Sequence, residues 1–197
     1  MRSYSSHDLL GKKLGIRDYT NTDLFTRLLN WIEGRTESAI MTIHIPALIY
    51  LKTEDICESI NARYKEYSVD YYAEELVSLL YNHFIDKAFN NKNGLKHAYD
   101  VLTKYERKTP VIIFHNAVKV YEASPQPQNK SMEIDMQLSK KEIRRGELLL
   151  YELDDLYGHH FTVESLIESI WIEFINDRRY TSHKKIINEL IEILESK

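Results

Sequence analysis

Two short segments that lie 93 residues apart share a strict alternation of apolar and polar residues. They read "MTIHIP" (41–46) and "IDMQLS" (134–139). A period of two is the geometry of a β-strand with one buried face. A single strand of this kind cannot bury that face or pair its edges. Each segment therefore needs a partner strand. The inward positions are Met41, Ile43 and Ile45 in the first segment, and Ile134, Met136 and Leu138 in the second.

A second repeated element lies downstream of each predicted strand. "EELVSLLYNHFIDK" (74–87) matches "ESLIESIWIEFIND" (164–177) at an offset of 90 residues. The shared apolar spacing forms the stripe of an amphipathic helix. Helical stretches at 46–67 and 140–158 separate strand from helix, so each copy reads strand, helix, helix. The matched pairs are Leu76 and Leu166, Val77 and Ile167, Leu80 and Ile170, Phe84 and Phe174, and Ile85 and Ile175.

Candidate capping residues agree with these boundaries. Pro46 suits the first position of a helix, where its missing N–H leaves no bond unmade. Gly158 suits a helix C-terminal stop. Ser68 or Asp70 is the expected cap of the last helix in the first copy, and Thr162 in the second.

The repeat divides the chain into five ranges. Residues 39–89 and 131–180 are the two copies, and both are acidic on balance. Residues 90–130 are basic on balance and predict a helix, a hairpin at 108–123 and a linker. Residues 1–38 predict a separate N-terminal arm with a helix near 21–34, and residues 181–197 a C-terminal helix. The expected fold is mainly α with a short β-ribbon.

Composition excludes several classes of protein. The net charge of −4 argues against a simple polyanion-binding protein, because phosphate contacts need Lys or Arg. No membrane span or secretory signal is expected, and the single Cys57 indicates an intracellular protein with that thiol buried. His159 and His160 predict a solvated turn rather than a metal site. No nucleophile, phosphate loop or carboxylate pair stands in a recognisable motif. We therefore expect neither a cofactor nor enzymatic activity.

The order of elements, with T-I-x-I-P at the end of the first strand, resembles the ribbon-helix-helix (MetJ/Arc-type) family of DNA-binding regulators. The resemblance covers about 39–88 and 131–178. Two copies in one chain are similar to the tandem single-chain regulators of archaeal lipothrixviruses. The resemblance implies an intrachain pseudo-dimer, in which 41–45 and 134–138 pair above four helices. Such a two-stranded ribbon fits the DNA major groove.

The resemblance also implies which residues touch DNA. Outward ribbon residues would contact bases, and the N-terminus of each last helix would hold a phosphate. Glu133 and two of the base-contact candidates depart from the basic residues that the family often carries there. The expected base contacts are Thr42, His44, Asp135 and Gln137. The expected phosphate contacts are Ser68, Val69, Thr162, Val163, Lys140, Lys141 and Arg144.

Three functions stay open at this point. The first is a sequence-specific transcription regulator that binds double-stranded DNA and self-associates, in the host cytoplasm if the protein is viral. The second is a structural or protein-interaction scaffold with nonspecific DNA binding or none. The third, an enzyme, would have only residues 1–38 and the 108–123 hairpin from which to build a site.

Overall fold

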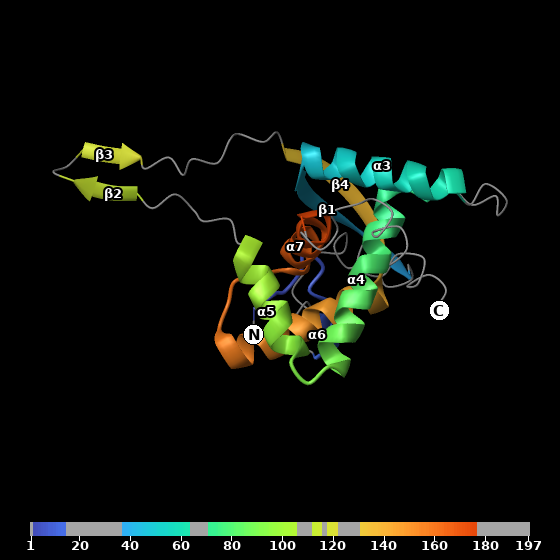
Figure 1. Cartoon of the computed structure of the whole chain (residues 1–197). Coiled ribbons are helices and arrows are strands. Elements are labelled where there is room, and N and C mark those ends of the chain that lie inside the picture. The colour runs from blue at the N-terminus through green and yellow to red at the C-terminus, as the bar shows by residue number, and fades with distance from the viewer. Residues whose placement is uncertain are drawn as a thin grey trace, which may run out of the picture.

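The computed structural model describes residues 2–14, 37–63, 71–105, 112–115, 118–121 and 131–176. The chain is mainly helical with a short two-stranded antiparallel sheet at its centre, as predicted (Figure 1). Its helices are α1 (Leu9–Lys13), α3 (Ala47–Arg63), α4 (Ala73–Asn90), α5 (Gly94–Tyr105), α6 (Lys140–Tyr157) and α7 (Val163–Asn176). Its strands are β1 (Ser38–Pro46), β2 (Ile112–His115), β3 (Val118–Tyr121) and β4 (Ser131–Ser139).

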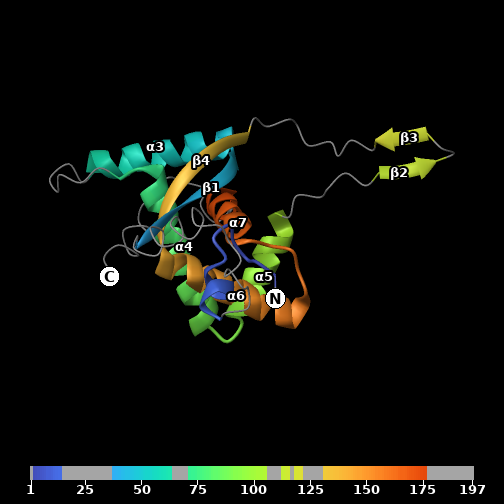
Figure 2. The ribbon, with the colours of Figure 1, turned by 180° about the vertical axis from the view of Figure 1, so that it is seen from behind.

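The central sheet consists of β1 and β4, the two segments that the alternation singled out (Figure 2). They run antiparallel, with Thr42 opposite Asp135 and Ile43 opposite Ile134. Each strand has nine residues and is longer than the 41–45 and 134–138 cores expected from the sequence. We call this pair of strands the ribbon. Because it is antiparallel, α3 and α6 leave from its opposite ends.

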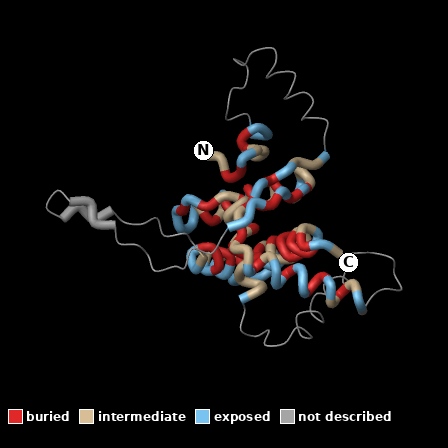
Figure 3. Tube along the Cα trace, turned by 90° about the horizontal axis from the view of Figure 1, so that it is seen from above, coloured by how far each residue is buried: buried red, intermediate tan, exposed pale blue. Residues whose placement is uncertain are grey.

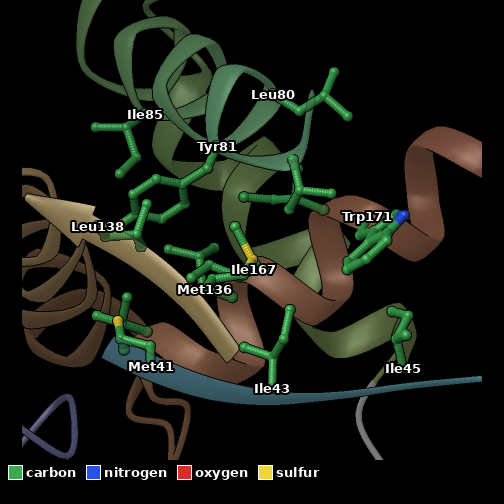
Figure 4. Close-up of a cluster of buried hydrophobic side chains, with 14 of the residues drawn as sticks. Met41, Ile43, Ile45, Leu80, Tyr81, Ile85, Met136, Leu138, Ile167 and Trp171 are labelled. Carbon is green, nitrogen blue, oxygen red and sulfur yellow. The ribbon is translucent and has the colours of Figure 1, made fainter. Parts of the chain in front are cut away.

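The inward face of the ribbon forms one wall of the hydrophobic core (Figure 4). Its predicted apolar residues are all buried and lie against α4 and α7. Burial of one such side chain is worth about 1.5–3 kcal/mol. Both copies contribute to the same cluster, so neither copy has a core of its own. In Figure 3 the buried stretches lie on the sides of the helices that face one another.

Two large aromatic residues occupy matching places in α4 and α7. Tyr81 and Trp171 are both fully buried. The Tyr81 hydroxyl donates to the carbonyl of Glu142 at 3.1 Å. Trp171 Nε1 donates to Thr53 Oγ1 at 2.7 Å. Phe84 and Phe174, expected in the core, are half-buried residues that pack at its margin.

The helix ends match the capping prediction in the second copy and differ in the first. Thr162 caps α7, with its Oγ1 accepting from Ser165 N at 3.4 Å. Gly158 ends α6 with a positive φ of 63°, which glycine adopts without strain. Pro46 is the last residue of β1 and directly precedes α3. α4 begins only at Ala73, where the Glu75 carboxylate accepts from Tyr72 N at 2.9 Å. Tyr72 therefore takes the capping position expected at Ser68 or Asp70.

The first residues of the chain pack on the body instead of forming a separate arm. Tyr4 is buried, and its hydroxyl donates to Asp154 of α6 at 2.8 Å. The fully buried Glu147 carboxylate accepts from the amides of Leu9 at 2.9 Å and Leu10 at 2.5 Å. It also accepts from the Ser5 hydroxyl. The N-terminal segment is thus held by charge-assisted hydrogen bonds, and the helix expected at 21–34 lies outside the described residues.

The remaining elements complete the fold. β2 and β3 form the hairpin expected within 108–123, with Phe114 opposite Lys119. The C-terminal helix expected at 181–197 lies outside the described residues. Cys57 is a buried free thiol, as predicted, and burial raises its pKa to about 11. Among the described residues, no helix has the length and apolar character needed to cross a membrane.

Candidate nucleic-acid interface

The outward face of the ribbon is the surface that the sequence pattern assigned to base contact. The alternation places every second side chain on it, and the four predicted residues all belong to it. Thr42, Asp135 and Gln137 are exposed, and the His44 side chain is 43% exposed. The structure therefore brings the four expected base contacts together on one face. Its members are Ser38, Ile40, Thr42, His44 and Pro46 from β1, and Ser131, Glu133, Asp135, Gln137 and Ser139 from β4.

Cross-strand hydrogen bonds fix the polar side chains of this face. Thr42 Oγ1 donates to Asp135 Oδ1 at 2.7 Å, directly across the ribbon. Gln137 Nε2 donates to Ser38 Oγ at the same distance. The first bond joins directly opposed residues and the second joins diagonal neighbours, and a cross-strand pair stabilises a sheet by about 0.2–1 kcal/mol. The pairs also hold Thr42 and Gln137 in defined orientations.

The face carries acidic and neutral groups. Glu133 lies opposite His44, with its Oε1 3.8 Å from His44 Nδ1. None of the ten outward positions of β1 and β4 is Lys or Arg. Carboxylates near DNA phosphates are repelled, by about 1 kcal/mol or more per contact at the effective dielectric of a protein surface. Electrostatic attraction to DNA phosphates must therefore come from cations beside the ribbon.

Such cations lie where α6 leaves the ribbon. Lys140, Lys141 and Arg144 occupy the first turns of α6, directly after Ser139. Lys141 is exposed, whereas Lys140 and Arg144 are half-buried. Ser139 accepts from Glu142 N at 3.1 Å, and Glu142 accepts from Ser139 N at 2.8 Å. This capping box fixes the start of the helix. The structure thus places the three predicted phosphate contacts together at one end of the ribbon.

The N-terminus of α7 does not offer the phosphate site expected there. The amide of Val163 donates to the carbonyl of Tyr4 at 2.7 Å, and that of Thr162 donates to Ser165 Oγ at 2.8 Å. Both amides predicted to bind a phosphate therefore already have acceptors within the chain. The N-terminal segment supplies the acceptor for the Val163 amide, and the local sequence of α7 contains no pattern that predicts this contact. Ser68 and Val69, the matching residues of the first copy, lie outside the described residues.

The outer edge of β1 is covered at two positions. Glu168 of α7 accepts from the His44 amide at 2.6 Å. His7 Nε2 donates to the carbonyl of Ile40 at 2.8 Å. An uncovered edge would be a template for pairing with another strand. These two contacts occupy one amide and one carbonyl of this edge, and the outward face is exposed.

The two adjacent histidines are not alike. His159 is buried, and its Nδ1 accepts from Phe161 N at 3.0 Å while Nε2 donates to the carbonyl of Leu150 at 2.8 Å. Burial lowers the pKa of His159, so its imidazole is neutral at pH 7. The solvated turn expected for both holds only for the exposed His160. Within the described part of the chain, no His, Cys, Asp and Glu side chains gather into a metal-binding group.

Three outward residues, Ser38, Ile40 and Ser131, were not predicted to belong to a strand. Ile40 is 63% exposed, lies opposite Gln137, and is the only large apolar residue on the outward face. Ser38 pairs with Ser139 at the end of the ribbon. The strand assignment of Ser38 and Ile40 was missed because Ile40 interrupts the alternation that begins at Met41. The preceding residues "SAI" (38–40) do not alternate between polar and apolar in step with 41–46, so the pattern did not predict a strand there.

No family model, curated protein or solved structure matches this chain. The ribbon-helix-helix resemblance accordingly depends on the residue pattern and on the geometry described above.

Proposed function

We propose that the protein is a sequence-specific DNA-binding transcription regulator that inserts the ribbon into the major groove. The observation that carries this proposal is the antiparallel ribbon of β1 and β4, with one face buried against α4 and α7 and the other exposed and mainly polar. The major groove admits a two-stranded ribbon. The protein would act by occupying or reorganising promoter DNA, without catalysis.

The register of the ribbon supports a tandem pseudo-dimer. Aligning the two sequence copies at an offset of 93 makes Thr42 equivalent to Asp135, and these residues face each other in the ribbon. In a symmetric dimer, equivalent residues face each other only at the twofold axis. The Thr42–Asp135 pair would thus lie on an approximate twofold axis that relates the two copies.

The packing of the helices supports the same arrangement. α7 packs on β1 and α4 packs on β4, so each last helix covers the strand of the other copy. Tyr81 of α4 donates to Glu142 of α6. Trp171 of α7 donates to Thr53 of α3, and Thr53 Oγ1 donates in turn to the Ile49 carbonyl at 2.9 Å. Ile49 is the equivalent of Glu142 at the offset of 93. The two contacts therefore end on equivalent carbonyls.

The chemistry of the outward face suggests which bases it would contact. Asp135 and Glu133 only accept hydrogen bonds when ionised, and the amino groups of cytosine and adenine are the donors in the major groove. Gln137 can pair with adenine, and Ile40 can contact a thymine methyl group. We therefore expect a base preference set by the amino groups of cytosine and adenine and by thymine methyl groups. The Arg–guanine contact, which is common in other DNA-binding proteins, would play no part on this face.

The test begins with selection of duplexes from a random pool by the purified protein. Thr42→Ala and His44→Ala should then weaken binding to the selected site by about 1–3 kcal/mol per lost contact and relax base preference at one position. Lys92→Ala is the control, because Lys92 is exposed in the turn between α4 and α5. An unchanged footprint and preference in both ribbon variants would exclude the ribbon as the reading surface.

Self-association along DNA belongs to the same proposal. α6 exposes apolar side chains that a second copy would cover, namely Leu148, Tyr151 and Leu156. Titration should then show tighter binding per site on long DNA than on a single-site duplex. Equal affinity per site on both would exclude cooperative binding.

The second candidate is a protein-interaction scaffold. Two carboxylates and the 63% exposed Ile40 on the outward face favour it, because such a face also suits a basic protein partner. The selection experiment separates the candidates. Recovery of a defined sequence that survives excess nonspecific competitor supports the regulator, and recovery of none supports the scaffold.

A further inference from the structure

The two ends of the ribbon differ in charge at equivalent positions. α3 and α6 begin directly after β1 and β4, and the offset of 93 relates their first turns. Ala47, Leu48 and Leu51 in α3 thus correspond to Lys140, Lys141 and Arg144 in α6. Three cations at one end of the ribbon are replaced by three apolar residues at the other.

The residues that differ between the two ends are exposed or partly exposed, so the difference in charge lies on the molecular surface. Leu48 is 56% exposed and Leu51 is 58% exposed, at the positions where α6 carries Lys141 and Arg144. Because these leucines face solvent, they add little hydrophobic stabilisation to the fold. They also carry no charge, so they cannot neutralise a phosphate. These positions of α3 therefore lack the cationic groups that would hold a DNA backbone.

The neighbouring charges enlarge the difference. α1 packs on α6 and brings the exposed Lys12 and Lys13 to that side of the molecule. Arg145 forms an ion pair with Asp86, and Glu142 is engaged by Ser139 and Asn82. Glu37 is the exposed acid at this end. At the other end, Glu133 lies on the ribbon, and α3 exposes one cation in its first turns, Lys52, followed by Glu54, Asp55 and Glu58. Positive potential is therefore concentrated at the α6 end.

From this asymmetry we propose that the protein holds duplex DNA through one end of the ribbon and binds in a single orientation. Lys140, Lys141 and Arg144 contact the phosphates on the α6 side, and the equivalent positions on the α3 side, which are apolar, make no such contact. The inference rests on the proposed DNA binding and adds the polarity of the complex. The recognised site is consequently non-palindromic, although two similar strands form the reading surface.

Exchange of the two sets of residues tests the proposal. Lys141→Leu with Arg144→Leu should reduce the slope of log affinity against log salt by about 2, because each lost phosphate contact removes about 0.9. Leu48→Lys with Leu51→Arg should raise the slope by a similar amount, by adding contacts on the α3 side. Lys141, Leu48 and Leu51 are exposed and Arg144 is half-buried, so thermal unfolding of each variant checks that it remains folded. Lys141→Gln with Arg144→Gln repeats the first test without exposing leucine.

Hydroxyl-radical footprints of the wild-type chain add a direct readout. We expect backbone protection on one side of the site only, and protection on both sides after Leu48→Lys with Leu51→Arg. Symmetric wild-type protection, or an unchanged salt slope in both Lys141/Arg144 variants, would overturn the polarity while leaving DNA binding intact. A wild-type protein that binds no duplex would overturn the proposed function and this inference together.

Discussion

At the scale of single residues, one buried carboxylate holds the N-terminal segment in place. Glu147 is fully buried and accepts from two successive amides, those of Leu9 and Leu10. A buried carboxylate is stable only when hydrogen bonds replace its lost hydration. The first turn of α1 supplies them, since the amides at the start of a helix have no partner within it.

Replacement of this carboxylate should loosen the segment. Glu147→Ala leaves two amides and the Ser5 hydroxyl without their acceptor, so we expect a loss of roughly 3 kcal/mol in the free energy of unfolding. Urea denaturation measures it. Asp155→Ala is the control on the same helix, and its exposed side chain should change stability by about 0.5 kcal/mol or less. Equal effects in the two variants would contradict the role given to Glu147.

A second residue-scale prediction concerns His159. Burial holds its pKa below the ordinary value of 6.5, so the folded state favours the neutral ring. As pH falls through 6.5, the unfolded chain takes up the proton first, and stability is lost until the folded pKa is reached. Asp154, whose pKa is lowered chiefly by the hydrogen bond from Tyr4, adds its own loss only at a lower pH, below 3.8.

Unfolding free energies at about pH 7.5 and about pH 5.5 should therefore differ, with the lower value at the acidic pH. His159→Gln should flatten this dependence, although it lowers stability at both values. His160→Gln, on the exposed neighbour, should leave the dependence unchanged. The explanation is wrong if the His160 variant alone flattens it.

At the scale of elements, the contact of α4 with α6 depends on a missing side chain. A Cβ on Gly146 would overlap the Tyr81 hydroxyl and lie 3.2 Å from a Val163 methyl carbon. At the equivalent position α3 carries Thr53, which bonds to Trp171. One helix pair thus fills the space with the tyrosine hydroxyl, and the other fills it with the threonine side chain. Burial and the neighbouring Glu142 raise the pKa of Tyr81, so this hydroxyl stays protonated and donates.

Gly146→Ala should accordingly destabilise the protein by about 1–3 kcal/mol through overpacking. Tyr81→Phe alone should cost about 1 kcal/mol for the hydrogen bond to Glu142. In the double variant the missing hydroxyl makes room for the new methyl group, so the combined cost should be smaller than the sum. Denaturant unfolding of all four proteins gives this coupling energy, and strict additivity would contradict the packing described.

At the scale of the whole molecule, the two sequence copies share one core. Each strand of the ribbon is covered by the last helix of the other copy, and Trp171 bonds to Thr53 across them. Neither copy can bury its apolar faces alone. The connection between the copies therefore adds stability, because it removes the entropy cost of bringing two chains together.

A fragment of residues 37–105 should for this reason fail to fold as a monomer. We expect weak helical circular dichroism at low concentration, or a dimer in which a second fragment replaces the missing copy. Mixing with a fragment of residues 131–197 should restore helicity, and sedimentation measures the size of each species. A stable, folded monomer of 37–105 would show that the copies are independent domains.

Prediction from the sequence succeeded where the signal was periodic and local. Alternation at 41–46 and 134–139 identified both strands, and apolar stripes identified α4 and α7. Thr162 and Gly158 were correct helix ends because capping depends on a few neighbouring residues. It failed at Ile40, where the alternation breaks, and at the N-cap of α4, which is Tyr72 instead of a short polar residue.

The sequence by itself determined the repeat, the two faces of the ribbon and the uneven charge of its ends. These features depend only on which residues follow one another along the chain. Only the tertiary structure decided the register that sets Thr42 opposite Asp135. It also decided that the Val163 amide donates to the Tyr4 carbonyl. These contacts join residues far apart in the chain. Their partners depend on how buried surfaces pack against each other, which no local pattern encodes.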